Sequence, residues 1–502
     1  ARLDISSPQT RDSPSRTTII VPKRATAPFP TTLAFDRKSA TPLQRQIFEQ
    51  IRSAILSGTL RAGTRLPSTR DLAREIGVSR KPVVAAFGYL AAQGLIECRP
   101  GAGSRVRPLA LTRQRVPAST RARRPKRAAR LQRIVVHISS GRVGAFKPGV
   151  PAVDLFPTRV WRTLVARRWS AAQPADLAYD DSRIRAALSS AIAAHLGATR
   201  GIRCDPAQVF VVSGAQQAID LAARVLVEPD DRVCVEDPGY AGARAAFASA
   251  GAEVVGGGVD AEGFDVSAAA SRCPRPRLIY ATPAHQYPTG VVMSAARRNE
   301  LLSWTAASGA WLIEDDYGGE FQYRANAPPP LFATDRNESV IYIGTFSQSL
   351  APALRVGFLV APADLIEAFR VAVYVCGHGI SAIDAQVLTD FIDGSHLAKH
   401  IRLLRSAYRE RQRELVAALA RIPAVVRIDG LDAGTHVVAY LRAEADEFAI
   451  AAAAARHGVE VSTLNAHAFE TSCPPALVLG YGSVPPESIR SSAALLARAI
   501  GE

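Results

Sequence analysis

A single basic segment divides this chain into two parts of different character. Between Arg105 and Arg133 it carries eleven Arg or Lys residues and no Asp or Glu, and three prolines interrupt it. Such a sequence buries too little apolar surface to fold, so residues 108–140 are predicted to be a disordered linker with affinity for polyanions. Residues 1–36, rich in Ser, Thr, Pro and Arg, are predicted to be a disordered tail.

Length and composition indicate a globular protein with more than one domain. The chain has 502 residues, of which 48% are hydrophobic. No apolar run approaches the roughly 20 residues that cross a bilayer, and the start of the chain shows no secretory signal. Six cysteines are scattered without CxxC or zinc-ligand spacing, which predicts reduced thiols and no metal site. We expect a cytoplasmic protein that does not enter a membrane.

Three helices are predicted between the tail and the linker. Apolar residues spaced by four predict the first helix, which Gly58 should end. Ser68 and Ser79 are candidate N-caps of the second and third helices, and Pro82 falls in the first turn of the third. The spacing of the first helix is carried by Leu43, Ile47, Ile51 and Ile55.

A hairpin is predicted after the third helix. Residues 95–99 and 104–106 are two short segments that flank a glycine-rich tip. Three helices followed by a hairpin form a winged helix–turn–helix, so residues 37–107 are expected to be a small, mainly α-helical domain. The segments RLPSTRDLA and GVSR, together with the glycine-rich wing, resemble the GntR-type regulators over Pro42 to Val106.

The GntR resemblance implies binding to double-stranded DNA. A recognition helix that opens with Ser79, Arg80 and Lys81 offers free N–H groups and two cations to a major groove. The wing would lie along the minor groove or the phosphates, and the basic linker would add phosphate contacts. The residues expected at the DNA are Ser68, Arg70, Ser79, Arg80, Lys81, Gly101, Gly103 and Arg105.

Beyond the linker, in residues 141–502, Ala-rich helices alternate with strands rich in Val and Ile. This alternation predicts an α/β domain with a mainly parallel sheet. Strand 209–212 leads through Gly214 into a helix that begins with Ala215 and Gln216. Unpaired N–H groups and the positive end of the helix dipole at such a turn suit a phosphate.

A second turn in this domain also suits a phosphate. Strand 340–343 runs into a turn rich in hydroxyls, and Arg355 follows that turn. The hydroxyls of Thr345 and Ser347 can converge with the guanidinium on a dianion. The turn as a whole, Gly344 to Gly357, resembles the active-site turn of fold-type I pyridoxal phosphate (PLP) proteins of the aspartate aminotransferase class.

This resemblance implies roles for residues between the two turns. Tyr240 would stack on the PLP ring, the loop 282–290 would lie beside the ring hydroxyl, and Tyr317 would lie near the ring oxygen. Asp315 would pair with the protonated pyridine nitrogen. The expected cofactor residues are Gly214, Ala215, Gln216, Tyr240, Asp315, Tyr317, Thr345, Ser347 and Arg355.

The C-terminal part of the chain narrows the resemblance. The segments 396–411 and Gly434-Thr-His436 resemble the small domain of MocR/GabR-type regulators, which fuse a GntR winged helix to an aminotransferase-like domain. This resemblance implies a small subdomain over approximately residues 375–502. It also implies a homodimer that reads paired half-sites in DNA and a small-molecule effector.

One residue departs from the resemblance at the centre of the predicted site. Gln348 stands where PLP enzymes hold the lysine that forms an imine with the cofactor, and an amide nitrogen is not nucleophilic. Lys147 and Lys399 are the lysines of the large domain, and neither is on the expected turn. Val478 stands where active aminotransferases hold an arginine for the substrate carboxylate. No catalytic residue is therefore predicted, and PLP, if bound, would be non-covalent.

Three functions follow from these features. The favoured one is a DNA-binding regulator whose aminotransferase-like domain senses a small ligand, such as PLP or a PLP–amino acid adduct, with little or no transaminase activity. The second is a working PLP aminotransferase with an appended DNA-binding domain, against which the position of the lysines argues. The third is a regulator whose large domain is only a platform for dimerisation or for a protein partner.

Overall fold

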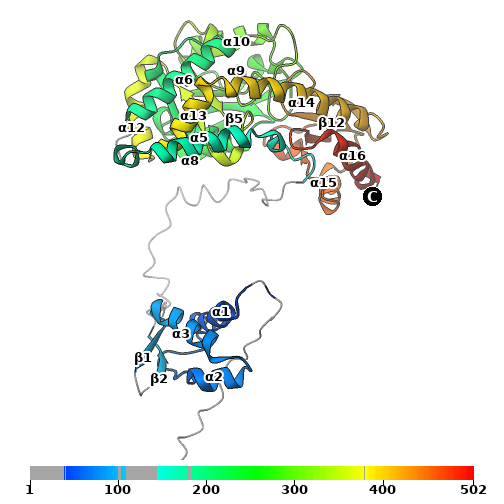
Figure 1. Cartoon of the computed structure of the whole chain (residues 1–502). Helices are drawn as coiled ribbons and strands as arrows, with labels where there is room; N and C mark the ends of the chain where they lie inside the picture. Colours follow the sequence, from blue (N-terminus) through cyan, green and yellow to red (C-terminus); the bar gives the residue numbers. More distant parts are fainter. Residues whose placement is uncertain are drawn as a thin grey trace, which may run out of the picture. The chain divides into compact units, whose positions relative to one another are not determined.

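The computed structural model describes residues 39, 41–99, 103–108, 144–178, 182–377 and 379–501. The predicted tail and all of the predicted linker except Pro108 lie outside these residues. The chain divides into two compact units, Ala1–Arg123 and Arg124–Glu502, which are described separately (Figure 1).

The first unit is a winged helix–turn–helix. Its core consists of the apolar face of the first helix, including Ile47 and Ile51, packed on residues such as Leu72 and Phe87 of the other two helices. The two strands pair antiparallel, with Ile96 opposite Val106. The elements are α1 (Leu43–Leu56), α2 (Thr69–Glu75), α3 (Arg80–Ala92), β1 (Ile96–Arg99) and β2 (Gly103–Val106).

The two predicted caps differ in the structure. Ser68 caps α2, because its hydroxyl accepts a 3.2 Å hydrogen bond from the Asp71 N–H. Ser79 occupies the N-cap position of α3, but the prediction that its side chain caps the helix is wrong. A capping hydroxyl accepts from the second or third helical N–H, and the third helical residue is Pro82, which has no N–H.

The second unit is built on an eight-stranded sheet in the order β3-β10-β9-β8-β7-β4-β5-β6. Strands β4, β5, β7, β8 and β9 are parallel, whereas β10 runs antiparallel between β3 and β9. The predicted α/β class with a mainly parallel sheet is confirmed. The strands are β3 (Val209–Val212), β4 (Arg232–Asp237), β5 (Glu253–Asp260), β6 (Gly263–Phe264), β7 (Leu278–Ala281), β8 (Trp311–Asp315), β9 (Val340–Thr345) and β10 (Gly357–Val360).

Helices cover both faces of this sheet. Along β7, Leu278 and Tyr280 pack into one apolar cluster with α7 and α8, and Ile279 and Ala281 pack into another with α9 and α10. All four residues of β7 are buried, as expected for a strand covered on two faces. The helices of this part are α5 (Thr158–Ala171), α6 (Ser182–Arg200), α7 (Ala215–Leu226), α8 (Ala241–Ala250), α9 (Val266–Arg272), α10 (Ala295–Ser308), α11 (Leu331–Thr334), α12 (Ile366–Val375) and α13 (Ala382–Asp393).

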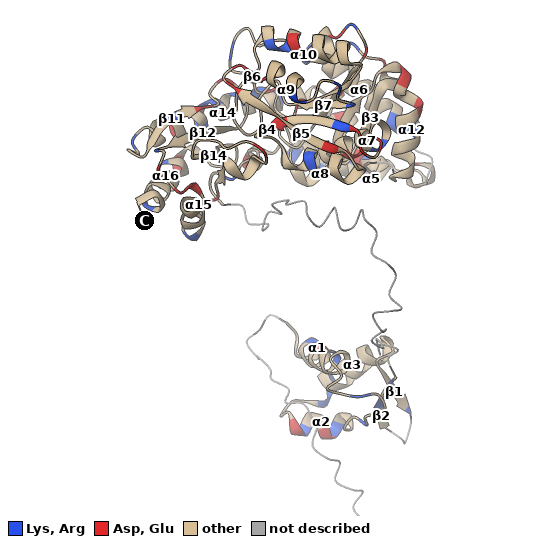
Figure 2. Cartoon of the chain, turned by 180° about the vertical axis from the view of Figure 1, so that it is seen from behind, with Lys and Arg blue, Asp and Glu red and all other residues tan. Residues whose placement is uncertain are grey.

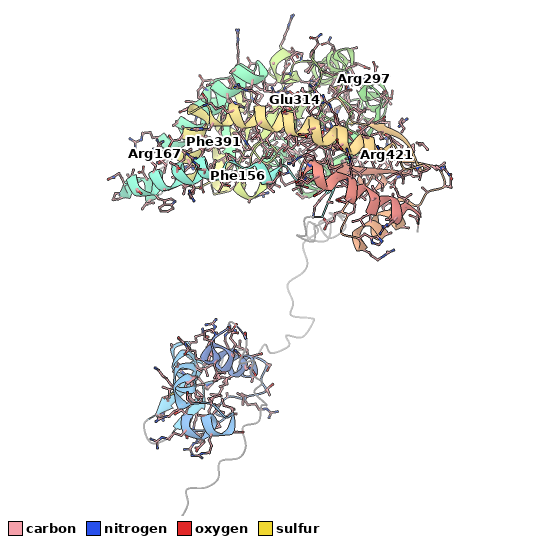
Figure 3. The ribbon with its side chains drawn as sticks, turned by 45° about the vertical axis from the view of Figure 1, so that its right-hand side comes forward. Phe156, Arg167, Arg297, Glu314, Phe391 and Arg421 are labelled. Atoms are coloured by element: carbon pink, nitrogen blue, oxygen red, sulfur yellow. The ribbon has the colours of Figure 1, made fainter. Side chains whose placement is uncertain are left out.

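Aromatic contacts join helix α5, near the beginning of this unit, to helix α13. The ring of Trp161 on α5 lies 5.7 Å from that of Phe156 and 5.5 Å from that of Phe391 on α13, measured between centroids. Figure 3 labels Phe156 and Phe391 in this region, together with Arg167 of helix α5. Arg167 pairs with Asp390, the neighbour of Phe391.

The C-terminal part forms a second sheet that packs on the long helix α14. In Figure 1 this helix runs across the α/β unit toward β12, α15 and α16. The sheet is antiparallel with the order β11-β12-β14-β13. The elements are α14 (His396–Leu419), β11 (Val425–Asp429), β12 (His436–Leu441), α15 (Glu447–Arg456), β13 (Ser462–Thr463), β14 (Ala476–Gly480) and α16 (Pro486–Gly501). None of the helices in the described parts of the chain has the length and apolar character to cross a bilayer.

A close backbone approach holds β10 against the turn that follows β3. A Cβ added to Gly357 would lie 2.8 Å from the Cα atom of Gly214 and 3.0 Å from the carbonyl oxygen of Gly344. Both contacts are with backbone, which cannot turn aside as a flexible side chain can. Only glycine at position 357 lets β10 lie between its two neighbours at this edge.

Replacing Gly357 by Ala should therefore destabilise the α/β unit by at least about 1–3 kcal/mol, the range for overpacking a rigid site. Urea unfolding followed by tryptophan fluorescence would measure this, because all four tryptophans lie in this unit. The matched control is G258A on β5, where an added Cβ meets nothing within 4 Å. Equal midpoints for the two variants would contradict the steric argument.

Candidate functional site

The topology of the large sheet brings the ends of several strands to one edge. The parallel strands β4, β7, β8 and β9 all end there, at Asp237, Ala281, Asp315 and Thr345. Strand β3 runs in the same direction as β9, because both are antiparallel to β10. Strand β10 begins at this edge, so Arg355, two residues before it, lies there as well. The carboxyl edge of such a sheet is where α/β proteins bind ligands.

A cavity of about 330 Å³ opens at this edge. Its volume is within the range of small-molecule sites. All nine residues predicted to bind a cofactor line it, and so does Gln348. These residues are spread along the chain from Gly214 to Arg355, and the structure places them around one cavity.

The carboxylate of Asp315 lies buried in the cavity wall. One of its oxygens, Oδ2, accepts a 2.6 Å hydrogen bond from the Tyr280 hydroxyl, and the other, Oδ1, has no partner among the described residues. Burial, with the negative charge of Asp316, raises the pKa of Asp315 from 3.8 to about 7, although the Tyr280 hydrogen bond lowers it. A cationic N–H donor from a ligand would satisfy the remaining oxygen.

The two neighbouring carboxylates, Glu314 on β8 and Asp316 just after it, are engaged by protein groups. Figure 3 shows Glu314 inside the α/β unit, where its two oxygens accept hydrogen bonds from the backbone N–H groups of Leu331 and Phe332. Asp316 Oδ2 accepts from Arg200 and from the Tyr342 hydroxyl, at 2.6 and 2.7 Å. Asp316 Oδ1, like Asp315 Oδ1, has no partner among the described residues, but Asp316 pairs with Arg200. Of these three carboxylates, Asp315 is the one that lines the cavity, and it forms no ion pair with a described residue.

The opposite part of the cavity is suited to a dianion. Helix α7 begins here after Gly214, whose φ of 98° is in the left-handed region. The N–H groups of Ala215 and Gln216 donate to no acceptor among the residues that the structure describes. Helix N-termini with free N–H groups attract phosphates. The Thr345 and Ser347 hydroxyls lie 3.0 Å apart beside them.

Arg355 completes this end of the cavity. It adopts a left-handed backbone conformation, with φ 51°, at the entry to β10. Within the described residues, its guanidinium forms no ion pair with a carboxylate. An exposed arginine that lines a cavity and lacks an internal partner can bind a phosphate with two parallel hydrogen bonds.

Aromatic side chains form the walls between the two ends. The Tyr240 hydroxyl donates to Gln216 Oε1 at 3.0 Å, and its ring meets that of Tyr287 edge to face at 6.1 Å. The Tyr317 hydroxyl lies 2.9 Å from His285 Nδ1. Burial holds the pKa of His285 well below its usual range, with a further decrease from His436. The rings of Tyr240, Tyr287 and Tyr317 thus give the cavity an uncharged aromatic wall.

Gln348 is fixed in the cavity wall by both ends of its amide. Its Nε2 atom donates to the Gly149 carbonyl at 3.0 Å, and its Oε1 atom accepts from the Thr435 hydroxyl at 3.4 Å. The side chain is almost fully buried. It therefore connects three segments of the unit that are far apart in sequence.

Several lining residues were not among the predicted cofactor residues. Tyr280 is on an apolar strand and looked like a core residue, and nothing in its sequence context distinguishes its hydroxyl. Thr435 and His436 belong to a segment that the sequence singled out only as a family motif. Pro148 and Gly149 come from the start of the unit. The local signal for Thr435 is a hydroxyl residue directly after a glycine, Gly434.

The predicted DNA-binding residues are at the surface of the first unit. Ser68, Arg70, Ser79, Arg80, Lys81, Gly103 and Arg105 are exposed, and Gly101 lies outside the described residues. In Figure 2 the ribbon of this unit is coloured for Lys or Arg on its helices and hairpin, and for Asp or Glu on α2. Arg80 Nε donates to the Thr69 hydroxyl at 3.2 Å, which ties α3 to α2, and Arg105 donates to the Gly63 carbonyl at 3.0 Å.

Comparison with known proteins agrees with this division of the chain. Residues 43–106 match the family of bacterial regulatory proteins of the gntR type, and residues 151–489 match the aminotransferase class I and II family. The probable rhizopine catabolism regulatory protein MocR of Rhizobium meliloti is 36% identical over 465 residues, which cover 91% of this chain and 94% of that protein. The chain belongs to the MocR-type regulators.

One further relative is similar over most of the chain, and one solved structure is similar to the second unit. The pyridoxine biosynthesis transcriptional regulator PdxR of Corynebacterium glutamicum is 28% identical over 91% of this chain and 96% of its own length. The α-aminoadipate aminotransferase LysN of Thermus thermophilus, solved with N-(5′-phosphopyridoxyl)-L-leucine, has 27% identity and a TM-score of 0.67 over 75% of this chain and 97% of its own. This MocR-type chain is thus a helix–turn–helix transcriptional regulator with a fold-type I aminotransferase-like domain.

Asp315 should make the fold of this regulator less stable as pH rises. Its pKa is higher in the folded than in the unfolded chain, so its stabilising effect is complete below about 3.8 and is lost as pH rises through about 7. Asp315→Asn should therefore become more stable relative to the original protein between pH 4 and 7, by on the order of 2–4 kcal/mol.

Urea unfolding at pH 5 and pH 8 would measure this difference. The control is D364N, since Asp364 is exposed, and its effect should be small and the same at both pH values. A D315N variant whose stability relative to the original protein does not increase from pH 5 to pH 8 would contradict the prediction.

Proposed function

We propose that this MocR-type regulator senses PLP, or a PLP adduct of a small amine or amino acid, in the cavity at the sheet edge and holds it without a covalent bond. The ligand state would then control DNA binding by the winged-helix domain. The observation that carries the proposal is Gln348, a buried amide held by Gly149 and Thr435 within a cavity that otherwise suits this cofactor.

The residues present fit PLP at both of its polar ends. The unpartnered Asp315 Oδ1 atom would accept from the protonated ring nitrogen, which increases the electron-withdrawing character that PLP supplies when it is bound. The free N–H groups of Ala215 and Gln216, the two hydroxyls and Arg355 would hold the phosphate. Tyr240 would cover the ring, and Tyr317 would lie near its oxygen.

The same cavity argues against a working aminotransferase. We infer that Gln348 replaces the lysine of PLP enzymes, and no described lysine lines the cavity. Lys147 is close in sequence to the lining residue Gly149, but its ammonium pairs with Glu460 at 2.8 Å. Transamination needs an amine that attaches the cofactor and moves the substrate proton. Without that amine, the site binds a ligand and does not turn it over efficiently.

We also propose that the regulator is a homodimer that reads paired half-sites. Three apolar side chains near the end of α12, namely Val371, Tyr374 and Val375, have exposed fractions of 61%, 70% and 72%. Exposed apolar clusters of this kind support an interface with another chain. Two winged helices in one dimer would match two operator half-sites.

Arg355→Gln should weaken PLP binding by about 10- to 100-fold, because the phosphate loses a charge-assisted, two-point contact. Equilibrium dialysis or calorimetry would measure the affinity. The control is R370Q, since Arg370 is an exposed arginine of α12 that pairs with Glu367, and its affinity should equal that of the original protein. Equal affinities in both variants would contradict the phosphate assignment.

Gln348→Lys should restore covalent attachment. After incubation with PLP and borohydride reduction, mass spectrometry should find the cofactor on residue 348 of the variant and on no residue of the original protein, which still binds PLP in dialysis. Binding of an operator fragment with and without PLP would then test the coupling to DNA. PLP fixed on a lysine of the original protein, with rapid turnover of an amino donor, would establish the aminotransferase alternative.

A further inference from the structure

Positive charge around the cavity is confined to the phosphate end. Among the lining residues that the structure describes, Arg355 is the only cation. The wall beyond Gln348 consists of Gly149, Tyr287, Thr435 and His436, which offer aromatic surface, a hydroxyl and backbone groups. A second anionic group on a ligand would therefore find no cation on this wall.

His436 does not supply the missing charge. Its ring is buried, its Nε2 atom lies 3.0 Å from the Pro288 carbonyl, and its centroid is 4.5 Å from that of His285. Burial lowers the pKa of His436 to about 4, so the ring is neutral at physiological pH. The neighbouring His285 is neutral for the same reason.

The strand paired with β12 carries an apolar residue on the sheet face of His436. His436 on β12 is paired with Gly480 on β14, and Val438 is paired with Val478. Directly paired residues, and residues two apart on a strand, lie on one face of a sheet. Val478 therefore shares the face of His436, where it is fully buried against Val438 and Leu464.

Arginines of this unit whose side chains are little exposed are already engaged by protein groups. Arg200 donates to Asp316 and to the Gly319 carbonyl, and Arg411 donates to Asp154 and to the Gly482 carbonyl. Moving either guanidinium toward the cavity would leave a buried carboxylate or carbonyl without its partner. A ligand carboxylate on the His436 side would thus lose its water and gain no ion pair.

We propose that the ligand portion beside the PLP ring is a primary amine without a carboxylate, bound as its phosphopyridoxyl adduct. This inference rests on the proposed function and adds the chemical class of the effector. The phosphate end carries the anionic group of the adduct, and the His436 wall, with Thr435 and Tyr287, receives a neutral, apolar or hydroxyl-bearing substituent. An α-amino acid fits less well, since its carboxylate would lie against neutral atoms.

Two reduced adducts that differ only in the carboxylate test this proposal. These are N-(5′-phosphopyridoxyl)-3-methylbutylamine and N-(5′-phosphopyridoxyl)-L-leucine, and calorimetry with the full-length protein would compare their dissociation constants. The amine adduct should bind at least about 10-fold more tightly, as expected when a desolvated charge has no partner. Equal affinities, or tighter binding of the leucine adduct, would overturn the inference.

Pyridoxamine phosphate serves as the reference that separates this inference from the proposed function. If pyridoxamine phosphate binds and the leucine adduct binds more tightly than the amine adduct, the proposed function stands and only the effector class is wrong. If neither it nor either adduct binds, the proposed function and this inference both fail. The variant V478R, with folding checked by circular dichroism, should shift the preference toward the leucine adduct, and the comparison in the original protein decides the question if the variant does not fold.

Discussion

The candidate site depends on one strand that runs against its neighbours. Because β10 is antiparallel to β3 and β9, it begins at the edge where they end, and Arg355 enters that edge together with the turn after β3 and the hydroxyls after β9. The glycine contact between positions 214 and 357 sets how closely these segments approach. The proposed anion site, with donors from three segments, follows from this topology.

The chemistry of the site follows from groups that the fold leaves incompletely satisfied. Glu314 accepts two backbone hydrogen bonds and Asp316 pairs with Arg200, whereas Asp315 lines the cavity with one oxygen unpartnered and no cation among the described residues. A buried polar atom of this kind costs stability in the absence of a ligand. A regulator can use that cost, since a ligand that supplies the missing donor stabilises one state of the protein over another.

Much of this arrangement could be predicted from the sequence, and the exceptions have physical reasons. The turns near Gly214 and Thr345 follow apolar strands directly, so local pattern was enough to identify them. Tyr280 was not identified, because a tyrosine on a buried strand looks the same whether its hydroxyl packs or supports a ligand-binding acid. The expected cap at Ser79 was wrong because the pattern of cap residues ignores which N–H groups are present, and Pro82 removes one of them.

The amide of Gln348 has a mechanical consequence for a protein in which DNA and the proposed ligand would be bound by different units. It spans from Gly149, among the first described residues of the α/β unit, to Thr435 of the small subdomain. A molecule that competed for either hydrogen bond would weaken the link that Gln348 makes between these two segments. Under the proposed function, occupancy of the cavity would therefore alter how the first described residues of this unit are held.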